Sequence, residues 1–131
     1  MVYGAILCVD DENIILDSFH EQLEKYFGTD YLYETADNAE EGLEIIEELL
    51  KDEIKILIIV TDWLMPGMNG DEFLIKVHEN YPSIVKIMLT GQANEEAINK
   101  AKNHADLFGV LYKPWSEAEL FNIIKSALNK I

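Results

Sequence analysis

The chain has 131 residues, of which 49% are hydrophobic, and this composition suits one packed domain and excludes a disordered segment. Its 10 basic and 25 acidic residues give a formal net charge of −15, which repels nucleic-acid phosphates and anionic lipids. Direct binding to nucleic acid or to a membrane surface is therefore not expected.

Short apolar runs alternate with amphipathic stretches along the whole chain. The runs at residues 5–9, 56–60 and 84–89 are nearly unbroken, as in parallel strands that are covered on both faces. Residues 31–33 are flanked by polar residues and indicate an edge strand, and residues 107–112 complete the set. The pattern therefore predicts five strands.

The stretches between these runs have the spacing that is typical of helices. Asn38 and Ser116 are predicted N-caps, each with a glutamate three residues later, and residues 70–81 form a helix that Pro82 ends. The apolar faces of the first two helices comprise Ile15, Phe19, Leu23, Tyr26 and Phe27 in one, and Leu43, Ile46, Leu49 and Leu50 in the other.

Residues 94–103 form the weakest predicted helix, because only Ala97, Ile98 and Ala101 are available for burial. A thin apolar face indicates a loosely held element. Five strands that alternate with five helices imply a doubly wound α/β fold with right-handed crossovers. In such a sheet, ligands bind outside the carboxyl ends of the strands.

The single cysteine, Cys8, excludes an intramolecular disulfide, and its apolar neighbours indicate a buried, unreactive thiol. The N-terminus shows no signal-peptide pattern. The longest apolar run, residues 56–60, is far shorter than the roughly 20 residues of a membrane-spanning helix. These features favour the cytoplasm and a single domain over residues 1–131.

Four of the predicted strands end in polar groups, which are Asp10 with Asp11, then Asp62, Thr90 and Lys113. Two carboxylates about 4 Å apart repel by roughly 4 kcal/mol at an effective dielectric near 20, so three ionised ones need a cation. Mg²⁺ favours carboxylate oxygens and uses few protein ligands. The alternative, that Asp10 or Asp11 only caps the following helix, is weaker for the pair together with Asp62.

A carboxylate, a hydroxyl and a lysine around a divalent cation indicate phosphoryl transfer onto the carboxylate. Asp62 is the predicted nucleophile and forms an aspartyl phosphate. Thr90 is expected to donate a hydrogen bond to a phosphoryl oxygen, and Lys113 is expected to offset its charge. None of the three histidines, which lie in predicted helices, completes a metal site.

Four segments resemble the receiver domain of bacterial two-component response regulators, and together they span nearly the whole chain. The segments are residues 9–12 (Val-Asp-Asp-Glu), 61–70 (Thr-Asp-Trp-Leu-Met-Pro-Gly-Met-Asn-Gly), 89–91 (Leu-Thr-Gly) and 112–115 (Tyr-Lys-Pro-Trp). The resemblance implies a flavodoxin-like (βα)5 fold with sheet order 2-1-3-4-5.

The resemblance also implies the roles of particular residues. Asp62 is the phosphoacceptor, and Asp10, Asp11, Asp62 and the backbone carbonyl of Leu64 hold Mg²⁺, with Asp11 the more direct ligand of the acidic pair. The peptide bond between Lys113 and Pro114 is expected to be cis, which is accessible at low cost only before proline. Pro66, Gly67 and Gly70 are expected to set the backbone angles of the following loop.

The partners that the resemblance implies are a histidine kinase or phosphotransfer protein as donor, and a downstream protein or fused output domain as reader. The protein then catalyses only its own phosphorylation and dephosphorylation. The fourth helix, fifth strand and fifth helix are the expected output surface, and a phosphorylation-dependent dimer through this surface is a further expectation. Both a stand-alone regulator and a receiver excised from a larger protein stay open.

The sequence disfavours two other functions. A phosphatase of the haloacid dehalogenase kind needs a second aspartate two residues after its nucleophile on the first strand, whereas Glu12 stands two residues after Asp10. A degenerate receiver that is never phosphorylated is disfavoured, because all the needed groups are present.

The sequence departs from the best-known receivers at the switch aromatic, where Val110 stands three residues before Lys113. Strand alternation places Tyr112 on the same face as Val110. Tyr112 either takes part of the switch role, together with Thr90, or is a core aromatic. Leu64 and Gln92 occupy the positions that tune loss of the phosphoryl group, and apolar Leu64 predicts a long-lived one.

Overall fold

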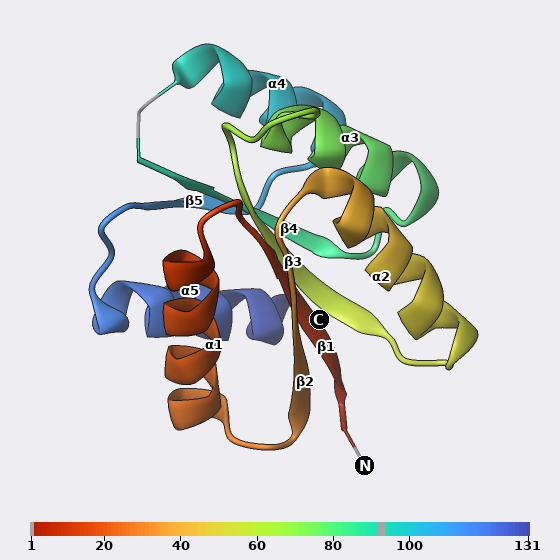
Figure 1. Ribbon diagram of the computed structural model, residues 1–131, viewed down its shortest axis with the longest axis vertical. Coiled ribbons are helices and arrows are strands. Elements are labelled where there is room, and N and C mark those ends of the chain that lie inside the picture. The colour runs from red at the N-terminus through yellow and green to blue at the C-terminus, as the bar shows by residue number, and fades with distance from the viewer. Residues whose placement is uncertain (1, 92–93) are drawn as a thin grey trace.

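The computed structural model describes residues 2–91 and 94–131, and within them five parallel strands form one sheet in the order β2-β1-β3-β4-β5. Helices cover both faces of this sheet (Figure 1). The predicted doubly wound fold and its strand order are confirmed. The strands are β1 (Gly4–Val9), β2 (Tyr31–Ala36), β3 (Ile56–Asp62), β4 (Val85–Thr90) and β5 (Gly109–Tyr112). The helices are α1 (Asn13–Phe27), α2 (Ala39–Lys51), α3 (Gly70–Asn80), α4 (Glu95–Ala105) and α5 (Glu117–Lys130).

Side chains of the strands alternate between two cores, one on each face of the sheet. In β1, Leu7 contributes to the core under α2, α3 and α4, whereas Ile6 and Cys8 contribute to the core under α1 and α5. Cys8 is buried, as predicted, and burial raises the pKa of its thiol well above the ordinary value. Because both faces are covered, β1, β3 and β4 are apolar along almost their whole length.

The strand bounds differ from the sequence prediction by one residue at the ends of β1 and β4 and by more in the other three strands. β2 runs to Ala36 because it pairs with β1 residue by residue, from Gly4 opposite Tyr31 to Val9 opposite Ala36. β3 includes Asp62, and β5 begins at Gly109 rather than two residues earlier. β2 lies at one edge of the sheet, as predicted.

The predicted caps are confirmed, whereas the predicted helix faces are partly wrong. Asn38 Oδ1 accepts the Glu41 N–H at 2.8 Å, and Ser116 forms a capping box. In α1, Leu16 is buried although the prediction omitted it, and Tyr26 is 39% exposed. Leu50 at the end of α2 is likewise exposed.

Helix α4 has the thin apolar face that the sequence predicted. Its buried residues are Ala97, Ile98, Ala101 and Ala105, three of which are alanines. It begins after Asn94, whose side chain accepts the Ala97 N–H at 2.8 Å. α4 packs beside α3 (Figure 1). None of the helices in the described ranges is long and apolar enough to cross a membrane.

Candidate functional site

The polar residues at the strand ends converge at the carboxyl edge of the sheet. Asp10 follows β1, Asp62 ends β3, Thr90 ends β4, and Lys113 follows β5. The parallel register sets these ends side by side, because Asp62 pairs with Leu89 and Thr90 pairs with Tyr112. The structure thus brings together all the strand-end groups that the sequence singled out.

Three carboxylates form a compact acidic cluster. Asp10, Asp11 and Asp62 each offer an oxygen, and these oxygens all lie within 4.8 Å of one another. Asp10 is fully buried, Asp62 is 7% exposed, and Asp11 is exposed. Asp10 Oδ1 also accepts the Glu12 N–H at 2.9 Å. The N-cap of α1 is Glu12, so neither Asp10 nor Asp11 caps that helix.

Lys113 supplies the positive charge of the site. Its Nζ lies 2.7 Å from Asp10 Oδ2, 3.5 Å from Asp62 Oδ1 and 3.3 Å from Glu12 Oε2. Glu12 is a partner that sequence reasoning missed, although its place directly after Asp10 and Asp11 was the available signal. The lysine therefore bridges β1, β3 and the start of α1.

The electrostatics of the cluster follow from burial and from the mutual repulsion of its carboxylates. Burial, with the charge of Asp10 as the next cause, raises the pKa of Asp62 to about 6. Burial also raises the pKa of Asp10, against the opposing effect of Lys113. Burial alone would lower the pKa of Lys113, but Asp10, Asp62 and Glu12 raise it above its ordinary value.

A divalent cation fits this arrangement of donors. The cluster is made of oxygens, as hard cations prefer, and Asp11 stands at its open side. Three carboxylates surround the single ammonium of Lys113, and burial and the charge of Asp10 keep the pKa of Asp62 raised despite that ammonium. A metal ion held by Asp10, Asp11 and Asp62 would supply the missing positive charge.

An open pocket of about 360 Å³ gives access to the cluster. Its lining includes Trp63, which also packs against the core, so this residue both borders the pocket and covers the sheet. Leu64 lines the pocket and is 58% exposed. Among the described residues, the lining consists of Asp11, Glu12, Asp62, Trp63, Leu64, Thr90, Gly91 and Lys113.

The glycines of the loop after Asp62 meet different requirements. Gly67 has a φ of 86°, a backbone conformation that favours glycine, as expected. The expectation of special backbone angles at Gly70 is wrong, because its φ is not in the left-handed region. Instead, a Cβ at Gly70 would collide with the backbone oxygen of Asp62. The Gly70 N–H also donates to Trp63 O at 2.6 Å, so α3 begins directly against the end of β3.

The switch candidates lie on β4 and β5. Thr90 is buried, and its carbonyl accepts the Lys113 N–H at 2.8 Å. Val110 is half-buried against the core, whereas Tyr112 is 47% exposed, so the alternative that Tyr112 is a core aromatic is wrong. The peptide bond between Lys113 and Pro114 is cis. Gln92 lies outside the described residues.

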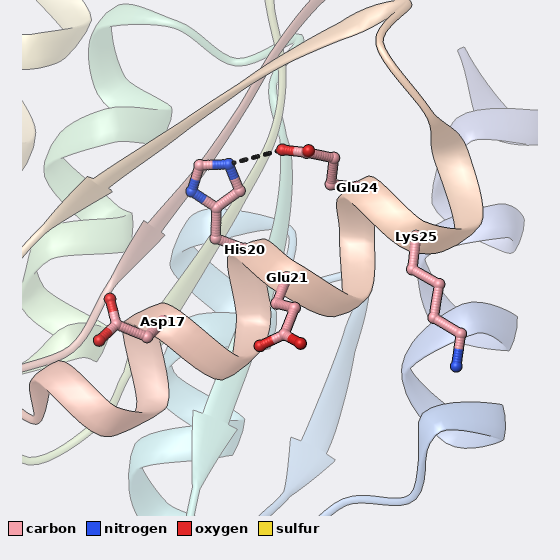
Figure 2. A pocket seen from close by; sticks show the side chains of 5 residues that line it. All are labelled: Asp17, His20, Glu21, Glu24 and Lys25. Carbon is pink, nitrogen blue, oxygen red and sulfur yellow. Dashed lines mark ion pairs between the residues drawn. The ribbon is translucent and has the colours of Figure 1, made fainter.

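A second hollow lies on the outer face of α1, and its side chains do not converge as those at the strand ends do. Figure 2 shows its side chains spread along the helix, with one ion pair, 3.3 Å long, between His20 and Glu24. Its lining comes from α1 alone, namely Asp17, His20, Glu21, Glu24 and Lys25. The chemistry therefore belongs to the strand-end site.

Comparison with known proteins shows which family the sequence matches. Residues 6–125 match the family model described as response regulator receiver domain. The chain is 31% identical to the hydrogenase transcriptional regulatory protein HoxA of Cupriavidus necator, over 95% of this chain and 24% of that protein. It thus spans about a quarter of the length of that relative.

Two further matches extend over nearly whole chains. Chemotaxis protein CheY-3 of Vibrio cholerae is 31% identical, over 97% of this chain and 95% of that one. The solution structure of the beryllofluoride-activated NtrC4 receiver domain dimer superposes with a TM-score of 0.82 at 30% identity. That match covers 96% of this chain and 97% of the other.

Proposed function

Because this chain belongs to the response regulator receiver domain family, we propose that it is a phosphoryl-accepting switch of a two-component system, with Asp62 as the acceptor. The observation that carries this proposal is the cluster of Asp10, Asp11 and Asp62 within 4.8 Å, together with Lys113 beside it. A buried acidic group opposite an ammonium, at the mouth of a pocket, suits a nucleophile that receives an anionic group.

The transfer is a displacement at phosphorus. An oxygen of Asp62 attacks, a new O–P bond forms, and the bond between phosphorus and the donor atom breaks, so that the donor leaves with its electron pair. Lys113, 3.5 Å from Asp62 Oδ1, lies where it offsets the charge of the transferred group. We assign to Thr90 the hydrogen bond that a phosphoryl oxygen accepts in the product.

Asp10, Asp11 and Asp62 are proposed to hold Mg²⁺ together with the backbone carbonyl of Leu64. When bound, the ion supplies positive charge to the phosphoryl oxygens. Within the protein, Asp10 keeps Lys113 at the edge of the sheet, and Trp63 borders the pocket. The only chemistry proposed is phosphorylation and dephosphorylation of the protein itself, which makes it a signalling domain without substrate turnover.

The proposed partners follow from membership of the family. They are not taken from any single relative. A histidine kinase or phosphotransfer protein donates the phosphoryl group in the cytoplasm, and a downstream protein or fused output domain reads the change through α4, β5 and α5. A phosphorylation-dependent dimer through this surface is part of the proposal. Residues 1–131 act as one receiver domain. This domain works either alone, as in a protein of the length of CheY-3, or as part of a longer regulator such as HoxA.

The decisive experiment is incubation with acetyl phosphate and Mg²⁺, followed by intact-mass measurement. We expect a gain of one phosphoryl group that is lost in Asp62→Asn and in the presence of EDTA. Asp17→Asn is a matched control, because this aspartate lies on the outer face of α1 and is expected to leave labelling unchanged. An unchanged mass, under conditions that label an established receiver, would overturn the proposal.

A further inference from the structure

A buried carboxylate that the phosphoryl chemistry does not use lies between α3 and α4. Asp71, in the first turn of α3, is 6% exposed. Its Oδ2 lies 3.6 Å from the Nζ of Lys100, an exposed residue of α4. Its Oδ1 is buried and has no hydrogen-bond partner among the described residues. Besides the N-terminus of α3, which favours a negative charge in its first turn, one long ion pair is the compensation that the described structure gives to this charge.

Asp71 is also tied closely to the acceptor residue. Gly70 precedes it, and the backbone of Gly70 sits against the Asp62 carbonyl so tightly that no Cβ fits there. The Gly70 N–H holds Trp63 O at 2.6 Å. A displacement of the backbone at Asp62 thus reaches Asp71 through rigid contacts rather than through a flexible loop.

The partner in this ion pair, Lys100, lies on α4, which has a thin apolar face. The face of α4 is made of Ile98 and three alanines, so little apolar area resists a small shift of this helix. A second polar atom, His78 Nδ1, is also buried without a hydrogen-bond partner among the described residues. His78 lies seven residues after Asp71 in α3, which places both on the same face of that helix. One face of α3 thus carries two buried polar atoms that have no hydrogen-bond partner among the described residues.

We propose that the Asp71–Lys100 ion pair holds α4 in its resting position and that phosphorylation of Asp62 releases it. This inference rests on the proposed function of Asp62. At 3.6 Å and with Lys100 exposed, the pair contributes modestly, and a shift of α4 that separates the two side chains removes that contribution. Because coupling between two sites is reciprocal, weakening the pair must also favour the phosphorylated form.

The test compares Lys100→Gln with the wild-type protein by two measurements. The first is amide exchange of α4 in the unmodified protein, which we expect to be about two- to fivefold faster in the variant. The second is the apparent affinity for beryllofluoride with Mg²⁺, a mimic of the phosphoryl group, followed by tryptophan fluorescence in a Trp115→Phe background, where Trp63 beside the pocket is the remaining tryptophan. We expect that affinity to rise by a similar factor, about two- to fivefold.

Three variants isolate the ion pair. Lys102→Gln makes the same charge change on the same helix, at a lysine without an ion pair in the described structure, and should match the wild-type protein in both measurements. Lys100→Arg keeps the charge and should also match it. In an Asp71→Asn background, Lys100→Gln should have no further effect, because the interaction is already lost.

Two results would overturn this inference. One is amide exchange of α4 in Lys100→Gln at the same rate as in the wild-type protein. The other is an unchanged affinity of Lys100→Gln for beryllofluoride although its α4 exchanges faster. Failure of the proposed function looks different, because the wild-type protein itself would then show no beryllofluoride response.

Discussion

Lys113 lies closer to Asp10 than to the proposed acceptor, with its Nζ 2.7 Å from Asp10 Oδ2 and 3.5 Å from Asp62 Oδ1. Asp10 is fully buried, so the ammonium is the counter-charge of a carboxylate that water does not reach. Lys113 therefore stabilises the folded protein in addition to its proposed part in phosphoryl transfer, and the two contributions can be measured separately.

We expect Lys113→Met to lower the free energy of unfolding by about 2 to 3 kcal/mol in the absence of Mg²⁺, because removal of one partner leaves buried charge uncompensated. Millimolar Mg²⁺ should restore part of this loss by replacing the missing positive charge. Urea unfolding with and without Mg²⁺ measures both effects.

Lys25→Met is the matched control for that variant. Its ion pair with Glu117 is 3.1 Å long, but both side chains are largely exposed, so water screens the pair and its loss should change the free energy of unfolding far less. Equal losses in Lys25→Met and Lys113→Met, or no response of Lys113→Met to Mg²⁺, would contradict the assignment.

Asp62→Asn should make the Mg²⁺-free protein more stable at neutral pH. The pKa of Asp62 is raised from 3.8 to about 6 on folding, so its ionised form is disfavoured in the folded state. The stability of the wild-type protein relative to Asp62→Asn is then highest near pH 4, falls as the pH rises to about 6, and is constant above that.

We expect the variant to exceed the wild-type protein by about 1 to 2 kcal/mol at pH 7, after allowance for the water that enters the open pocket. Urea unfolding between pH 4 and pH 8, without Mg²⁺, measures the difference. A difference that does not change with pH would show that Asp62 is not the group that titrates.

Leu64→Asn should shorten the lifetime of the phosphoryl group. Leu64 lines the pocket and offers no hydrogen bond to a water molecule, whereas an amide side chain can orient one for attack. One hydrogen bond of about 0.5 to 1.5 kcal/mol corresponds to about two- to tenfold faster decay. Phosphate release after labelling measures the decay, with Leu64→Met as the apolar control, and unchanged decay in Leu64→Asn would refute the prediction.

Tyr112 and Val110 should respond differently to truncation. Tyr112→Ala removes an exposed ring opposite Thr90, so we expect little change in stability or in Asp62 labelling, but loss of the beryllofluoride-induced change in amide exchange at α4 and β5. Val110→Ala removes a half-buried side chain and should cost about 1 kcal/mol in stability while keeping that change. The opposite pattern would assign the switch role to Val110.

The sequence by itself determined the fold and the edge of the sheet where the site lies. Three strands are nearly continuous apolar runs because both faces of the sheet are covered. The N-caps Asn38 and Ser116 are recognisable from the few residues around them, so the starts of α2 and α5 could be predicted. Parallel strands place their carboxyl ends at one edge, so the order of polar residues along the chain was enough to group Asp10, Asp62 and Thr90.

Helix faces and strand lengths were predicted less well, for a local reason. Tyr26 and Leu50 have the right spacing for the core but lie near the ends of α1 and α2 and stay exposed. The ring of Tyr26 contacts Phe121 of α5 instead. The polar second half of β2 is held by its pairing with β1, which propensity does not reveal.

Only the tertiary structure decided which charged side chains form ion pairs. Glu12 and Lys113 are 101 positions apart, and no local pattern relates them or joins Asp71 on α3 to Lys100 on α4. The same holds for Gly70, whose missing side chain makes room for the Asp62 carbonyl. Such contacts depend on how separate elements pack to within a few ångströms, whereas the sequence pattern specifies only which face each element buries.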